Sequence, residues 1–168
     1  MKGFFKKNVR DRERLTSIIL KMDRVMNVDD DFSTYYRRAE DIEECLRTFR
    51  NIRRSHRSVR FDYDDVLNTE LYRYQRGHVP SICGLTGETL LTPFTELARA
   101  CNIIVLSDGT KLPYPDDLKV GNRATGQAWL ADGTEVFSPR HALAHSIQST
   151  AQMLRSWAIS FQERMMES

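Results

Sequence analysis

Hydrophobic residues recur at helical spacing through the first half of the chain. The i, i+3, i+4, i+7 spacing of one helical face is followed by Leu15, Ile18, Ile19, Met22, Val25 and Met26. This stripe predicts a helix from about Arg10 to Met26. A second stripe predicts a helix from about Ser33 to Arg54, with Ser33 as its N-cap; its members are Tyr35, Ala39, Ile42, Leu46, Phe49 and Ile52. Because each helix has one apolar face to bury, the two should pack as an antiparallel hairpin.

Two further helices are indicated by their end signals. Residues 64–75 fit a third helix, since Gly77 can supply a left-handed C-cap and Pro80 prevents continuation. Thr92-Pro93 is typical of an N-cap followed by the first helical residue. That pair predicts a helix whose apolar face contains Phe94, Leu97, Ala98 and Cys101.

The pattern then changes to short β-branched runs with sharp turns. Residues 103–106 read Ile-Ile-Val-Leu and lead into Asp108-Gly109, and a similar phrase returns at Asp132-Gly133. Residues 106–115 and 130–139 agree at five of ten positions. Asp-Gly between apolar flanks predicts a tight hairpin with positive φ at both turn residues. We therefore expect two hairpins of one small antiparallel sheet.

The C-terminal segment predicts a pair of helices. Ser138-Pro139 opens a short helix to about His145, and Ser149 with Gln152 fits the capping box of a second helix. The arrangement is helix-turn-helix-like, with Gln152 and Arg155 on the exposed side of the second helix, where they could contact bases. Over about residues 128–158, the phrase Asp-Gly-Thr-x-x-x-Ser-Pro-x-x-Ala resembles small modules attached to homing endonucleases and restriction-associated proteins, although the glycine expected between the helices is missing. Two helices that simply pack beside a sheet are the competing interpretation.

These elements predict an α+β fold. We expect residues 1–77 to form a helical arm or hairpin region and residues 78–168 an α+β region with a C-terminal helix pair, within one compact domain. The core of the C-terminal part should centre on Trp129, Phe137, Leu143, Leu154, Trp157 and Phe161. If the N-terminal helices project as an arm, their long apolar stripe would suit a homodimer.

Composition narrows the class of protein. Hydrophobic residues make up 40% and charged residues 29% of the 168 positions, as in ordinary globular proteins. No apolar run is long enough to span a bilayer, and no apolar segment follows the N-terminal lysines as in a signal peptide. Three widely spaced cysteines, Cys45, Cys83 and Cys101, suit reduced thiols rather than a disulfide framework. The expectation is a cytoplasmic protein that is not secreted and does not contact a membrane.

The strongest candidate for a site is a run of arginines. Six fall within 14 residues, and no carboxylate interrupts the chain from Leu46 to Phe61. They are Arg47, Arg50, Arg53, Arg54, Arg57 and Arg60. Residues 1–76 carry a net charge of +4 and residues 77–168 a net charge of −2, so a polyanion site is expected in the first half. Cations also favour a helix C-terminus for dipole reasons, and Asp62, Asp64, Asp65 and Glu70 could neutralise the run.

Other chemistry has weaker signals. Asp117-x-Lys119 resembles the Asp/Glu-x-Lys element of a large nuclease group, in which Asp108 and Glu96 would complete the metal site. Asp108 is equally explained by its turn. His141 and His145, at i and i+4, could share a metal, as could His78, Cys83 and Cys101, but no further ligand stands at a known spacing. We expect no metal and no cofactor.

The arginine run makes a nucleic-acid-binding regulatory or accessory protein the leading hypothesis. We expect an accessory protein of viral or phage kind rather than an enzyme. If all six arginines met phosphates, log K would fall with log salt at a slope of about −5. A protein–protein interaction factor that acts through its helical hairpin, as a structural or inhibitory subunit, is the first alternative. A metal-dependent nuclease is the second.

Overall fold

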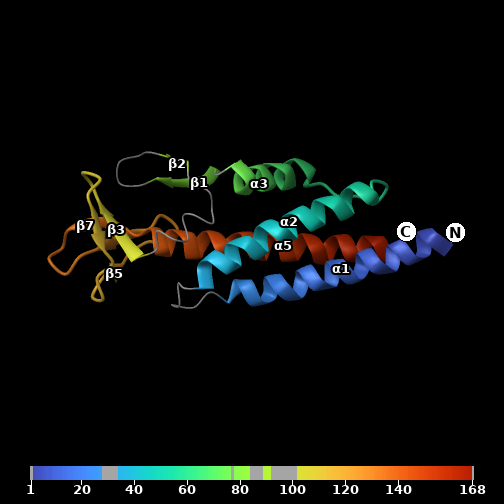
Figure 1. Cartoon of the computed structure of the whole chain (residues 1–168), viewed down its shortest axis with the longest axis horizontal. Coiled ribbons are helices and arrows are strands. Elements are labelled where there is room, and N and C mark those ends of the chain that lie inside the picture. The colour runs from blue at the N-terminus through green and yellow to red at the C-terminus, as the bar shows by residue number, and fades with distance from the viewer. Residues whose placement is uncertain (1, 28–33, 77, 84–88, 92–101, 168) are drawn as a thin grey trace.

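The computed structural model describes residues 2–27, 34–76, 78–83, 89–91 and 102–167, and places side chains at residues 6–27, 34–35, 37–71 and 102–167. In these residues, long helices run side by side along the molecule and a small sheet lies at one end (Figure 1). The helices are α1 (Lys2–Met26), α2 (Tyr35–Ser55), α3 (Asp64–Arg76) and α5 (Pro139–Glu167). Together with the antiparallel sheet they confirm the α+β class. The helix expected after Thr92-Pro93 lies outside the described residues.

α1 begins earlier than its apolar stripe predicted, at Lys2 rather than near Arg10. The stripe itself is confirmed, because Leu15, Ile18, Met22 and Val25 are all buried. They pack mainly along α5 and less extensively against α2, so the predicted hairpin of α1 and α2 is completed by the C-terminal helix. Polar contacts support this pairing, since Gln162 Nε2 donates to the Arg12 carbonyl at 2.8 Å and to Thr16 Oγ1 at 2.6 Å. The stripe is therefore covered within the chain.

α5 is one continuous helix, so the predicted break near residues 146–149 is wrong. One buried face continues across the expected break, through Leu143, Ile147, Ala151 and Leu154. No glycine or proline interrupts these residues, and burial of an unbroken apolar face favours propagation of the helix. Ser149 Oγ lies 3.4 Å from His145 Nε2, within hydrogen-bond distance, and does not cap a new helix. The helix does begin at Pro139, as Ser138-Pro139 predicted.

Five short strands form the sheet in the order β4-β3-β7-β6-β5, with antiparallel pairing throughout. They are β3 (Ile103–Leu106), β4 (Lys111–Pro113), β5 (Lys119–Val120), β6 (Gln127–Trp129) and β7 (Glu135–Phe137). Both predicted hairpins are present, and they meet through the pairing of β3 with β7. A separate ribbon pairs β1 (His78–Cys83) with β2 (Thr89–Leu91).

The two Asp-Gly turns differ in detail from the prediction. Only the glycines have positive φ, at 88° for both Gly109 and Gly133, and no described non-glycine residue does. The loops are longer than the two-residue turn we expected, because Leu106 N donates to the Thr110 carbonyl and Leu130 N to the Thr134 carbonyl. This is the three-residue hairpin, a type I turn followed by a left-handed residue. Each aspartate accepts the backbone N–H two residues on, at 2.9 Å.

The hydrophobic interior is divided unequally. One large cluster runs between α1, α2, α3 and α5 and takes in Phe137 from the sheet. A small cluster on the opposite face of the sheet contains Ile104, Ala128 and Val136. Of the predicted C-terminal core residues, Phe137, Leu143, Leu154, Trp157 and Phe161 are buried in the large cluster. Trp129 is only half-buried and lies across Gly121, outside both clusters.

A candidate anion site lined by arginines

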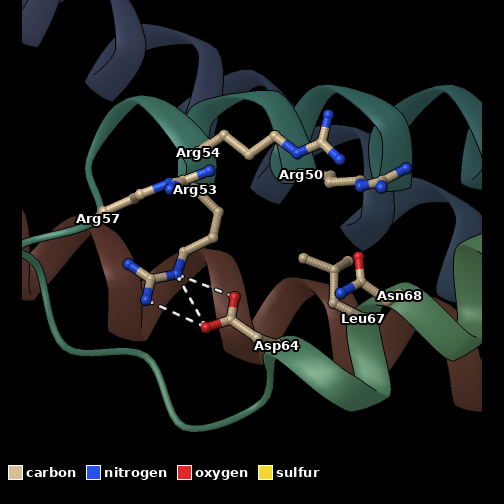
Figure 2. A pocket seen from close by; sticks show the side chains of 7 residues that line it. All are labelled: Arg50, Arg53, Arg54, Arg57, Asp64, Leu67 and Asn68. Atoms are coloured by element: carbon tan, nitrogen blue, oxygen red, sulfur yellow. Dashed lines mark hydrogen bonds and ion pairs between the residues drawn. The ribbon is translucent and has the colours of Figure 1, made fainter.

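α3 folds back along α2, and the two helices enclose a hollow of about 370 Å³. Four of the six arginines of the run line it, three from the C-terminal end of α2 and Arg57 from the turn that follows, and residues of α3 line the other side (Figure 2). We call it the arginine cleft; its lining residues are Arg50, Arg53, Arg54, Arg57, Asp64, Leu67 and Asn68. Four arginines and one aspartate give this lining a formal charge of +3. Arg47 and Arg60 lie outside it.

Arg53 has a different role from its neighbours in the cleft. Its side chain is only 14% exposed, and Nε and Nη2 bind the Asp64 carboxylate at 3.0 and 3.1 Å. Nη1 also donates to the carbonyls of His56 and Val59, at 3.0 and 2.7 Å. The guanidinium further lies over the rings of Phe61 and Phe161. These contacts hold the α2–α3 connection against α5, so Arg53 is engaged by the chain's own acceptors.

Two other arginines of the run are paired at the surface. Arg47 donates to Glu43 at 2.8 Å, one helical turn before it. Arg60 lies 3.3 Å from Asp62, and both side chains are more than half exposed. Exposed pairs of this kind contribute little free energy, and salt screens them. Neither residue shares the cleft.

Arg50, Arg54 and Arg57 form no ion pair with any described residue. Arg50 Nε is shielded from solvent and finds no acceptor there either. Figure 2 shows Arg50 and Arg54 extending from α2, and Arg57 from the turn that follows, at the cleft, whereas Arg53 turns away from them toward Asp64. Positive charges held close together repel each other, and an anion between them would relieve that repulsion. Guanidinium forks also suit phosphate, because each can donate two parallel hydrogen bonds.

A second basic hollow lies between the end of α1 and the start of α2, and some of its cations contact acceptors of the chain itself. Lys21 lies within 4 Å of carboxylates on Asp41 and Glu44. Arg38 donates to the carbonyls of Val25 and Asn27 and so caps the end of α1. Lys21 and Arg38 therefore join the two helices. Arg24 and Arg37 also line this hollow, which gives its lining the same formal charge of +3 as the arginine cleft.

The residues predicted to contact bases do not join the cleft. Arg155 Nε lies 3.4 Å from the Asp23 carboxylate, which ties this part of α5 to α1. Gln152 is exposed on the same helix. Because α5 packs along α1 and α2 over its length, it is not a projecting recognition helix.

The other sequence candidates are dispersed. Hydrogen bonds from the Thr110 hydroxyl and backbone N–H lower the pKa of Asp108, which is fully exposed in its turn. Asp117 is exposed just before β5, Lys119 is exposed as its first residue, and Glu96 lies outside the described residues. His141 Nε2 lies 2.9 Å from the Tyr114 hydroxyl, and His145 is exposed. Among the residues that the structure describes, no three His, Cys, Asp or Glu side chains gather as a metal site.

Cys45 is the cysteine whose side chain lies among the described residues. Cys45 is free and buried in the helical core, and burial raises the pKa of its thiol to about 11. The side chains of Cys83 and Cys101 lie outside the described residues.

None of the described helices combines the length and apolar character needed to cross a membrane.

Comparisons with known proteins give no family for this chain. No family model matches it, and neither a curated protein nor a solved structure is significantly similar. The candidate site therefore rests on the geometry of its own residues.

Proposed function

We propose that this protein is a nucleic-acid-binding regulatory or accessory protein that contacts phosphates through the arginine cleft. The observation that carries the proposal is that Arg50, Arg54 and Arg57 line one hollow and form no ion pair in the described part of the chain. A nucleic acid supplies several phosphates at regular spacing, so one strand can satisfy several guanidinium groups at once.

The number of arginines available for phosphates sets the expected salt dependence of binding. Arg53 is committed to Asp64, and Arg47 and Arg60 lie outside the cleft. Three arginines remain for phosphates, rather than the six that the sequence suggested. Each neutralised phosphate contributes about −0.9 to the slope of log K against log salt for a duplex and about −0.7 for a single strand. The expected slope is therefore roughly −2 to −3.

The test is fluorescence anisotropy with labelled oligonucleotides over a range of salt concentrations. Changing Arg50, Arg54 and Arg57 together to Ala should bring the slope close to zero and weaken binding most strongly at low salt. The same three changed to Lys should retain most of the slope, because the charge remains, but bind more weakly because the bidentate fork is lost.

Arg47→Ala is the matched control, since Arg47 is exposed on the same helix but lies outside the cleft. This variant should keep the slope and affinity of the parent protein. The absence of salt-dependent binding in the parent protein would refute the proposal. So would a triple Ala variant that binds as the parent does while its circular dichroism shows intact helices.

A further inference from the structure

A second surface, apolar and aromatic, lies on the other side of the start of α3. It is a shallow groove between α3 and α5, lined by Tyr63, Val66, Met153, Ser156, Trp157 and Ser160. Tyr63 is 51% exposed and Val66 43% exposed, so two neighbouring apolar side chains reach solvent here. We call this surface the aromatic groove.

The ring of Tyr63 is held in a fixed orientation. It stacks on Trp157, with 5.9 Å between ring centroids and 18° between ring planes. Phe61 contacts it edge-on, at 5.7 Å and 71°. Trp157 is itself buried, so the stack has a rigid base in the helical core. Because one face of Tyr63 rests on Trp157 and its side meets Phe61, the exposed half of the residue includes the opposite face.

The aromatic groove adjoins the arginine cleft. Tyr63 is followed directly by Asp64, which lines the cleft and binds Arg53. Phe61 links the two surfaces. Its ring centroid lies 5.7 Å from the guanidinium carbon of Arg53 and 5.7 Å from the ring centroid of Tyr63. An occupant that leaves the cleft over the first turn of α3 would therefore meet the open face of Tyr63.

We propose that the occupant is a single-stranded nucleic acid, with phosphates in the arginine cleft and one base stacked on Tyr63. This inference rests on the proposed function and narrows its ligand. Single strands are bound by the combination found at these two surfaces, a basic groove for the backbone beside aromatic rings on which bases stack. The contribution of such stacking tolerates different base sequences, because every base has a π-face.

A duplex fits these two surfaces less well. In a duplex the bases are stacked on one another and paired, so the face of Tyr63 would have no base to receive. Reading a duplex through its major groove would need a projecting helix or ribbon. α5, which the sequence had suggested for that role, is packed against α1 and α2.

The test compares short single-stranded DNA and RNA probes with a duplex of the same sequence, by fluorescence anisotropy. Tyr63→Leu keeps an apolar cover over Trp157 but removes the π-face, and it should weaken binding of single strands by roughly 5- to 100-fold. The salt slope should not change, because the phosphate contacts remain. Tyr63→Phe keeps the ring and should bind as the parent protein does.

Leu20→Ala is the control for the loss of an exposed apolar side chain, since Leu20 is 58% exposed on α1 and lines neither surface; we expect parental affinity. Binding of the duplex should be weaker than that of the single strands and insensitive to Tyr63→Leu. Parental affinity of Tyr63→Leu for single strands, or tighter binding of the duplex, would overturn the inference while the salt slope and the arginine variants still support the proposed function. A parent protein that binds neither probe would overturn both.

Discussion

The helical body and the sheet of this protein are stabilised in different ways. Among the described residues, 25 buried hydrophobic side chains form the helical core, whereas only three form the small cluster on the outer face of the sheet. The sheet depends on its antiparallel hydrogen bonds and on turns that require glycine. Both candidate binding surfaces lie on the helical body, where buried packing fixes the orientation of the side chains. This contrast implies that the two regions will respond differently to the loss of apolar volume and to changes at glycine.

The largest effect is expected from Phe49→Ala. Phe49 is fully buried and contacts the rings of Phe61, Trp157 and Phe161. Its removal should lower the free energy of unfolding by about 3–5 kcal/mol, because transfer and cavity terms add. Val136→Ala, in the small cluster of the sheet, should cost about 2 kcal/mol. Urea denaturation followed by circular dichroism would measure both, and equal losses would contradict the proposed difference between the regions.

Arg53→Ala should have the next largest effect on the free energy of unfolding. It tests whether this arginine of the cleft supports the fold rather than binding an anion. It would leave Asp64 and the carbonyls of His56 and Val59 without their donor, at a cost of about 3 kcal/mol. Arg54→Ala, one residue further on, should change stability by less than about 0.5 kcal/mol, because Arg54 is exposed. Matched thermal melts of the two variants provide the measurement. A similar loss in both would show that Arg53 has no special structural role.

A smaller difference is expected between two glycines of the sheet. Gly126 has a φ of 75°, and an added Cβ would lie 2.6 Å from the ring of Phe137 and 2.7 Å from the Ser138 carbonyl oxygen. Gly109 has a φ of 88° but open space around it. Gly109→Ala should therefore cost only the strain of the left-handed backbone, about 1 kcal/mol, and Gly126→Ala roughly 2 kcal/mol more. Differential scanning calorimetry would resolve this, and equal melting temperatures for the two variants would remove the steric argument.

Some features were predictable from the sequence because they depend on local spacing. The apolar stripes of α1 and α2 and the start of α5 at Pro139 follow from helical periodicity and end signals. The Asp-Gly hairpins follow from the need for a left-handed residue, although in each turn the glycine, Gly109 or Gly133, adopts that conformation and the aspartate does not. The break expected in α5 was wrong because capping signals were given more weight than a buried face that continues without interruption.

The sequence by itself determined the positions of most helices, the two turns and the presence of six arginines close together in the chain. Only the tertiary structure decided which arginines pair internally. Asp64 meets Arg53 because α3 folds back along α2, and the same packing leaves Arg50, Arg54 and Arg57 around a hollow and places Tyr63 on Trp157. Helical periodicity depends on the backbone and on burial of one face, both of which are local. The partner of a charge depends on which element packs opposite it, and chain distance does not specify that.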